Sequence, residues 1–234
     1  MAAPPPQTLV LNTLFSLVET FNDFLNVSIH TILYSRTLYR PHNFITTSKY
    51  NLPVQQNRHP QVCTWICRAC SEVQTLLLKG ILRCIFIVIY SQDAEVIERW
   101  VFDVDHFPVA LEEDALTELN VLGVDKVSLV DVEEQLRATI QKLKYCGERM
   151  AALPENSTFT VMVELKDKAD PPTGHLQPWV LSEPILDTEE KGNSTTTRAD
   201  LGGVRRMHVR TVEAGLFRFK AWVEEGKTGP NDDR

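Results

Sequence analysis

Three cysteines in the stretch VCTWICRACSEV have a spacing that could hold an iron–sulfur cluster. Cys63, Cys67 and Cys70 follow one another as C-x-x-x-C-x-x-C, a spacing similar to the cluster-binding pattern of radical enzymes that use S-adenosylmethionine. In such sites, cysteine thiolates hold the iron. The alternative is that the three thiols fill one face of a helix, where a free cysteine behaves as a small hydrophobic residue.

The surrounding residues favour the helix. With 3.6 residues per turn, Cys63 and Cys70 fall on one apolar arc. The same arc contains Val62, Ile66, Ala69, Val73, Leu76 and Leu77. Seven residues of helix separate the two cysteines by about 10.5 Å along the axis, too far for two ligands of one metal ion. The radical enzymes also carry an aromatic residue just before the third cysteine, where this chain has Ala69. We therefore predict core cysteines, with no metal and no cofactor.

Other patterns of enzyme chemistry are absent from the sequence. It contains no nucleophile elbow, no P-loop and no His-Glu pair of the metalloprotease type. The six histidines are scattered, and His30 lies within a long apolar run, where a structural role is expected. We therefore predict that the protein is not an enzyme. Turnover measured without any partner would contradict this prediction.

Composition and charge narrow the function classes further. The 234 residues are 43% hydrophobic and 24% charged, which is typical of one globular domain. No apolar run reaches the roughly 18 residues of a membrane span, and the N-terminus lacks the pattern of a secretory signal. The five cysteines are then expected to be reduced thiols.

The negative charge is unevenly distributed along the chain. The formal net charge is −7; residues 91–134 contain 13 acidic and 2 basic residues, whereas residues 198–220 contain 6 basic and 2 acidic ones. Nucleic-acid binding needs a basic surface, so no direct sequence-specific nucleic-acid binding is expected. The basic segment lacks the interleaved aromatic residues of a stacking platform. It remains a weak patch for nucleic acid or for an acidic partner.

Hydrophobic periodicity predicts an α+β fold with three helices packed on an antiparallel sheet. The helices are expected over residues 9–38, 60–78 and 127–150, the first of them central and covered by the sheet. Strands are expected over residues 81–90 and 95–105, which form a hairpin, and over 157–166, 204–212 and 216–225. Residues 44–56 read as a short β segment that Pro53 limits to an edge or a hairpin.

Trp65 lies at the edge of the apolar stripe of the second helix. Its neighbours on the helix surface are Gln61, Arg68 and Glu72. A half-exposed tryptophan beside charged residues is either a recognition residue, because it offers a large contact area, or a residue covered by a loop. The two interpretations merge if the covering segment is a bound peptide.

Several sequence segments together resemble the HORMA domain family. They are FLNVSIHTILYSRTLY, KYNLPVQ, ERWVFDV, VEEQLRATI, STFTVMV and PWVL, which occur in the family's order from about residue 21 to residue 225. Within the family, they look like the non-catalytic HORMA subunits of translesion DNA polymerase zeta. This implies one HORMA domain over residues 9–226, with disordered tails at residues 1–8 and 227–234.

The resemblance implies a non-enzymatic peptide clamp. In this family a C-terminal segment called the safety belt, here residues 167–226, wraps over a partner peptide that adds to the sheet as a strand. The peptide-binding residues would be Trp65, Tyr50, Pro53, Trp179 and Leu181. The belt is rich in proline and glycine, and its late strands read as lacking a strong core pattern. We therefore expect a chain ending at Lys166 to lose peptide binding while keeping its three helices.

Two further surfaces are implied by the resemblance. Glu134, Arg137 and Lys144 would form a HORMA homodimer or heterodimer interface on the third helix. The late strands would receive the C-terminal domain of a Y-family scaffold polymerase. Their contact residues would be Arg206, Met207, Lys220 and Trp222. Arg206 and Lys220 are charged at positions where the family is expected to have less polar residues. The polar segment 187–203 is also longer than the family core requires.

The resemblance therefore implies an adaptor protein that takes part in translesion DNA synthesis. It is expected in the nucleus and also in the cytoplasm. It would bind a proline-containing peptide of the catalytic subunit of polymerase zeta and bridge it to a Y-family polymerase. The alternative is a spindle-checkpoint HORMA protein that binds mitotic regulators. The segment KYNLPVQ favours the first.

Overall fold

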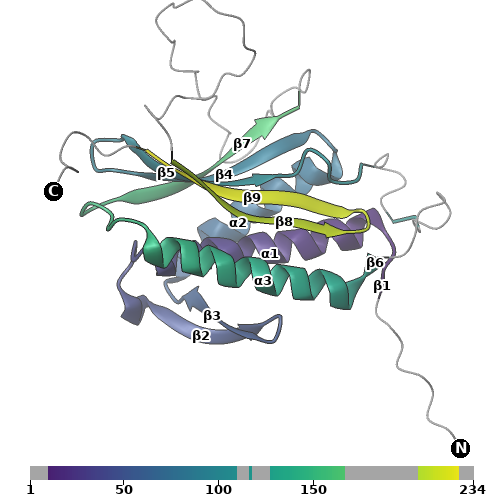
Figure 1. Ribbon diagram of the computed structural model, residues 1–234, viewed down its shortest axis with the longest axis horizontal. Coiled ribbons are helices and arrows are strands. Elements are labelled where there is room, and N and C mark those ends of the chain that lie inside the picture. The colour runs from purple at the N-terminus through teal and green to yellow at the C-terminus, as the bar shows by residue number, and fades with distance from the viewer. Residues whose placement is uncertain (1–9, 110–115, 118–126, 167–204, 227–234) are drawn as a thin grey trace, which may run out of the picture.

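The computed structural model describes residues 10–109, 116–117, 127–166 and 205–226, and within them it has three layers (Figure 1). A five-stranded sheet forms one layer, three helices pack against one of its faces, and a two-stranded hairpin covers the helices from the other side. The predicted α+β class is correct. The predictions for Trp179, Leu181, the segment 187–203 and both tails lie outside the described residues.

The three predicted helices are present, and local capping sets their ends. Helix α1 (Leu14–Ser35) begins after Thr13, which forms a capping box with Ser16. Helix α2 (Pro60–Leu78) starts at a proline and is followed by Gly80, whose φ of +68° suits the left-handed end of a helix. Helix α3 (Leu129–Arg149) is capped by Ser128. The first helix is shorter than predicted because Val10 and Leu11 form strand β1 instead.

The main sheet is antiparallel with the order β7-β4-β5-β9-β8. Its strands are β4 (Leu82–Tyr90), β5 (Val96–Asp103), β7 (Thr158–Leu165), β8 (Arg205–Ala214) and β9 (Phe217–Glu225). Strand β1 (Val10–Leu11) pairs with β6 (Val127–Ser128), and the short helix η1 (Pro41–Asn43) leads into the hairpin of β2 (Phe44–Lys49) and β3 (Leu52–Asn57). Each segment predicted as a strand is therefore a strand in the structure. The late hairpin β8–β9 joins the sheet because β9 pairs with β5.

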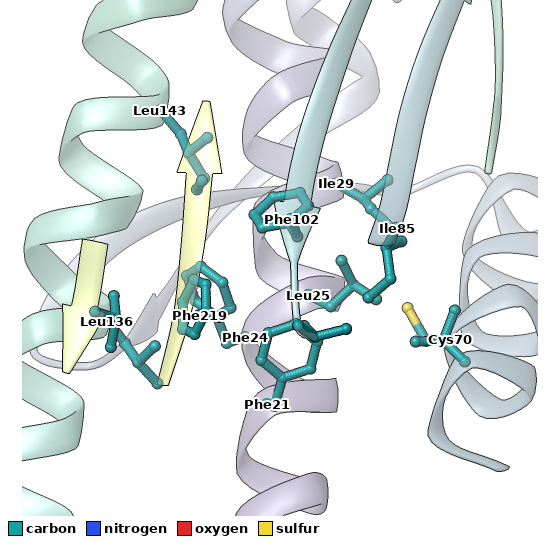
Figure 2. Close-up of a cluster of buried hydrophobic side chains, with 14 of the residues drawn as sticks. Phe21, Phe24, Leu25, Ile29, Cys70, Ile85, Phe102, Leu136, Leu143 and Phe219 are labelled. Atoms are coloured by element: carbon teal, nitrogen blue, oxygen red, sulfur yellow. The ribbon is translucent and has the colours of Figure 1, made fainter. Parts of the chain in front are cut away.

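The core lies between α1 and the sheet, and the late hairpin contributes to it (Figure 2). Phe219 of β9 packs against Phe21 and Phe24 of α1, with ring centroids 5.2 and 5.1 Å apart. Phe217 is fully buried beside them. The prediction that the late strands lack a core pattern is wrong. A chain ending at Lys166 would expose these rings, and its helices are not expected to stay folded.

The cysteines of α2 have three different environments. Cys70 is buried in the core, as predicted. Cys63 is only partly buried, and its thiol donates to the Asn57 carbonyl at 2.8 Å. Cys67 is exposed, because its position on the helix lies outside the apolar arc, so the prediction of a core cysteine is wrong there. The described residues contain no group of His, Cys, Asp or Glu side chains arranged to hold a metal ion.

No helix in the described part of the chain is long and apolar enough to cross a membrane.

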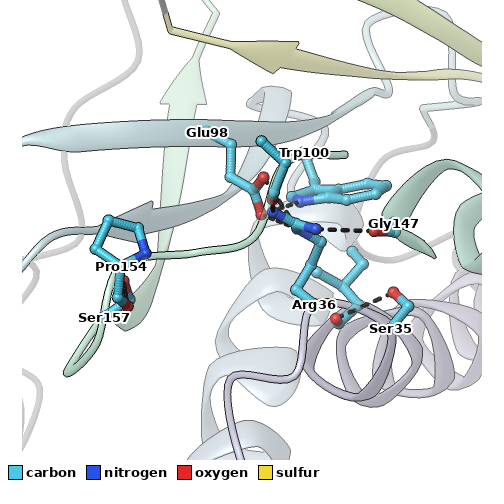
Figure 3. A network of polar contacts seen from close by, with 9 residues as sticks. Ser35, Arg36, Glu98, Trp100, Gly147, Pro154 and Ser157 are labelled. Carbon is cyan, nitrogen blue, oxygen red and sulfur yellow. Dashed lines mark hydrogen bonds and ion pairs between the residues drawn. The ribbon is translucent and has the colours of Figure 1, made fainter. Parts of the chain in front are cut away.

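A buried ion pair joins the C-terminal end of α1 to the sheet and to α3 (Figure 3). The Arg36 guanidinium donates to both carboxylate oxygens of Glu98 on β5, at 3.0 and 3.1 Å. It also donates to the carbonyls of Gly147 and Ala151 at the end of α3. Trp100 donates its indole N–H to Glu98 at 3.2 Å. Burial raises the pKa of Glu98, and Arg36 opposes this effect. The network fixes the relative positions of α1, α3 and β5.

His30 should make folding stability depend on pH. It is buried in α1, its Nδ1 accepts a hydrogen bond from the Asn57 N–H, and burial lowers its pKa from 6.5 to about 4. The folded protein therefore binds fewer protons at His30 than the unfolded chain between these values, so stability falls as the pH falls. We expect a loss of about 2 kcal/mol from this group between pH 7.5 and 5, measured by urea unfolding.

A pair of variants separates the effect of His30 on stability from the effects of other groups that titrate at acid pH. His30→Gln should flatten this part of the pH dependence, whereas His42→Gln, at an exposed position in η1, should leave it in place. Equal pH dependence in all three proteins would contradict the assignment to His30.

Candidate functional site

Strand β7 is an outer strand of the main sheet. It pairs with β4 along one side, and no strand in the described ranges pairs with its other side. Backbone groups alternate in direction along an antiparallel strand. The Lys166 N–H donates to the Ile81 carbonyl, towards β4. The N–H and C=O groups of Leu165, Val163, Val161 and Phe159 therefore point away from β4. Among the described residues nothing pairs with these groups, so they form an edge, open within that part of the chain, that an added strand can use.

The helix-facing side of this edge is apolar and includes Trp65. Val161 is buried, and Phe159, Val163 and Leu165 are partly buried against the core. Trp65 of α2 is half-buried and packs edge-on against Phe159, with ring centroids 5.1 Å apart at 80°. Its predicted half-exposed position is confirmed. Trp65, Phe159 and the outward backbone groups of β7 lie together. Of these, only Trp65 was predicted as a binding residue; Phe159 and the β7 edge were not.

The opposite side of β7 is more polar. Met162 accepts a hydrogen bond from the Tyr90 hydroxyl at 3.4 Å, and Glu164 forms an ion pair with Arg83 at 3.1 Å. A peptide added to β7 would direct alternate side chains to these two sides. One set would meet Trp65 and Phe159, and the other would meet Met162 and Glu164. The edge therefore suits an extended peptide with alternating apolar and polar side chains.

Two of the predicted peptide contacts lie elsewhere. Tyr50 and Asn51 have φ values of 54° and 52° between the paired residues Lys49 and Leu52, which makes a tight two-residue turn. The turn buries Tyr50. Burial raises the pKa of Tyr50, with smaller contributions from Asp23 of α1 and Glu133 of α3. The Tyr50 side chain thus lies near α1 and α3, on the side of the helices that faces away from the sheet.

Pro53 is exposed on β3 of the same hairpin. The structure therefore brings Trp65 to the open edge but not Tyr50 or Pro53.

The residues predicted for a dimer interface lie on the solvent-facing side of α3. Arg137 forms an ion pair with Glu134 at 3.5 Å, and Lys144 forms one with Glu148 at 3.8 Å. Each pair is exposed and lies within the helix, so it contributes only about 0.3–0.5 kcal/mol to stability. These side chains are available to a partner without disturbing the fold.

The predicted second-partner residues divide between the two faces of the late hairpin. Arg206 and Trp222 lie on the face away from the helices, where the guanidinium stacks on the indole ring at 4.9 Å. Lys220 is exposed on the same face of β9. Met207 instead packs against the main core, because adjacent residues of a strand point to opposite faces. Met207 is therefore not part of this surface.

Glu224 organises the charges of the second-partner surface. It accepts from Arg206 at 2.6 Å and from the Trp222 indole at 2.8 Å, and it pairs with Arg99 at 2.9 Å. Burial alone would raise the pKa of Glu224, but these hydrogen bonds and the two arginine charges outweigh it and lower the pKa. The buried carboxylate thus holds Arg206 in place over the tryptophan.

Comparison with known proteins identifies the family. The HORMA domain model matches residues 18–208. The chain belongs to the HORMA domain family. It is 31% identical over 209 residues to a zebrafish (Danio rerio) protein named mitotic spindle assembly checkpoint protein MAD2B, covering 87% of this chain and 88% of the relative. It is 30% identical over 208 residues to the DNA polymerase zeta processivity subunit of Schizosaccharomyces pombe, covering 89% and 92%.

Solved structures agree with this HORMA fold. A chain in the crystal structure of a mitotic checkpoint complex superposes with a TM-score of 0.65 at 21% identity, covering 89% of this chain and 97% of that one. Caenorhabditis elegans HTP-2 bound to the HIM-3 closure motif gives a TM-score of 0.63 at 12% identity, covering 97% and 100%. At these identities the likeness shows the fold alone.

Proposed function

We propose that this HORMA protein is a non-enzymatic adaptor that binds an extended partner peptide along the open edge of β7. The observation that carries the proposal is the row of outward backbone groups on β7 beside Trp65 and Phe159. Main-chain hydrogen bonds to such an edge supply affinity, and the flanking side chains supply specificity. The safety belt, residues 167–226, would close over the peptide.

The partner we propose is a proline-containing peptide of the catalytic subunit of DNA polymerase zeta. The support is the fission-yeast relative, whose name is polymerase zeta processivity subunit and which matches over nearly its whole length. The chain would then act in translesion DNA synthesis in the nucleus. The surface of Arg206, Lys220 and Trp222 would receive the C-terminal domain of a Y-family polymerase and so link the two enzymes.

The second candidate is a spindle-checkpoint role with the same clamp and different ligands. It is supported by relatives whose names contain "mitotic spindle assembly checkpoint protein", including a Dictyostelium discoideum MAD2A that is 29% identical over 175 residues. Pull-downs from nuclear extract after replication damage and from mitotically arrested cells separate the two. Recovery of polymerase zeta in the first supports the proposal, and recovery of mitotic regulators alone in the second contradicts it.

A proline in β7 tests the strand-addition site. The Val163 N–H points away from β4, so Val163→Pro removes a donor from the open edge without removing a hydrogen bond of the sheet. We expect at least a tenfold loss of affinity for a fluorescent proline-containing peptide of the catalytic subunit, about 1.4 kcal/mol. Val163→Ala keeps the N–H and should cost less. Equal affinity of Val163→Pro and the unmodified chain would contradict the site.

We also propose that the protein self-associates through Arg137 on α3, as its resemblance to the HORMA family implies. Arg137→Ala should shift the protein towards monomer in light scattering, while circular dichroism and peptide binding stay unchanged, because the side chain is exposed and its ion pair is local. Arg40→Ala, an exposed arginine outside α3, is the control. If the unmodified protein is monomeric at high concentration with peptide bound, the interface prediction fails.

A further inference from the structure

Gln135 on α3 makes two hydrogen bonds to the main chain of Glu213 on β8. Its Nε2 donates to the Glu213 carbonyl at 2.7 Å, and the Glu213 N–H donates to its Oε1 at 3.1 Å. A side-chain amide offers one donor group and one acceptor, as a peptide group does. Gln135 therefore occupies the position that a backbone group of a neighbouring strand would take.

These hydrogen bonds lie at the outer edge of the late hairpin. Strand β8 is the last strand of the sheet, and Glu213 is opposite Arg218 of β9. Both backbone groups of Glu213 point away from β9, as those of alternate residues in an edge strand do. The edge of β8 is therefore occupied at Glu213, in contrast to the open edge of β7.

The helix that carries Gln135 is itself firmly held. Leu136 and Val132 of α3 are buried in the core, as is Val212 of β8. At its other end, α3 is tied to α1 through the hydrogen bond from Arg36 to the Gly147 carbonyl. Gln135 thus connects a hairpin at the end of the sheet to a helix that is anchored at several points.

We infer that Gln135 is a positioning residue that latches the β8–β9 hairpin to α3. Because β9 pairs with β5 and Gln135 binds the main chain of Glu213, the hairpin can detach from the sheet only if it leaves both β5 and α3. The latch therefore slows hairpin opening in the free protein. It also slows release of a bound peptide, a consequence that rests on the proposed clamp.

Amide hydrogen exchange on the free protein tests the latch without any ligand. Gln135→Leu keeps a side chain of similar size but removes both hydrogen bonds. Exchange across β8 and β9 should become about fivefold to tenfold faster. This factor is at the low end of what two hydrogen bonds contribute, because both are partly exposed to water. Exchange in α3 should not change. Gln141→Leu, at an exposed position six residues further along α3, should leave β8 and β9 unaffected.

A conservative variant distinguishes a latch from simple packing. Gln135→Met keeps the length and packing of the side chain but can form neither hydrogen bond to Glu213, so hairpin exchange should be as fast as in Gln135→Leu; exchange as slow as in the unmodified protein would show that packing alone holds the hairpin. Unchanged exchange in Gln135→Leu, or the same acceleration in Gln141→Leu, overturns the latch.

Peptide release supplies the functional readout. The dissociation rate of a fluorescent proline-containing peptide of the polymerase zeta catalytic subunit should rise about fivefold to tenfold in Gln135→Leu, with little change in association rate. If hairpin exchange becomes faster in Gln135→Leu but the dissociation rate of the peptide does not change, the latch does not control peptide release. If the unmodified chain does not bind the peptide at all, the proposed function fails, and the exchange experiment still decides the latch.

Discussion

Trp65→Ala should weaken binding of the clamped peptide by about 30- to 1,000-fold, equivalent to about 2–4 kcal/mol. The reason is the position of Trp65 beside the open edge of β7, where its ring packs on Phe159 and leaves its other parts available to a ligand. A tryptophan at the centre of an interface removes a large apolar area from water when a partner covers it. Fluorescence titration with the proline-containing peptide measures the loss.

An exposed neighbour on the same helix supplies the control for Trp65. Arg68→Ala changes a side chain one turn away that lies outside the contact with Phe159, and should alter affinity only slightly. Thermal unfolding must show that Trp65→Ala remains folded. Unchanged peptide affinity in a folded Trp65→Ala protein would remove Trp65 from the site.

Arg36→Ala should destabilise the fold by about 3–5 kcal/mol, because it leaves the buried Glu98 carboxylate without its partner. The same change removes the hydrogen bonds to the Gly147 and Ala151 carbonyls, which join α1 to the end of α3. Urea unfolding measures the free energy. A loss of this size is a large part of the total stability of an ordinary domain.

A surface ion pair of similar length is the control for Arg36. Arg83 and Glu164 are 3.1 Å apart, and their side chains are 41% and 38% exposed, so Arg83→Ala should cost at most about 1 kcal/mol. The double variant Arg36→Met with Glu98→Leu removes both charges and should recover part of the stability. Equal losses in Arg36→Ala and Arg83→Ala would contradict the importance of burial.

Local patterns predicted the helices and strands well, because each is encoded within a few residues. The bounds of α2 follow from Pro60 at its start and Gly80 after its end. The prediction for the late strands is wrong although the sequence carries the signal: Phe217, Phe219, Ala221 and Val223 mark a buried face of β9, and the residue between the last two, Trp222, lies on the opposite face with charged neighbours. The same alternation places Met207 and Arg206 on opposite faces, which the sequence already allowed.

The candidate site was only partly predictable, because it depends on contacts between distant segments. The apolar strand that became β7 was recognised, but its place at the sheet edge depends on which strands pair, and β9 joins β5 across more than 100 residues. The burial of Tyr50 depends on a tight turn in which a tyrosine has a positive φ, a conformation more typical of glycine and asparagine. Trp65 was found because a helical periodicity alone places it beside an apolar stripe.

Residue-resolved amide exchange upon peptide addition tests the central claim most directly. If the peptide adds as a strand to β7, the outward amides of Phe159, Val161, Val163 and Leu165 should gain strong protection when peptide binds. The amides of Thr160, Met162 and Glu164 already face β4 and should change little. Tight binding with no new protection on the outward amides of β7 would contradict the clamp.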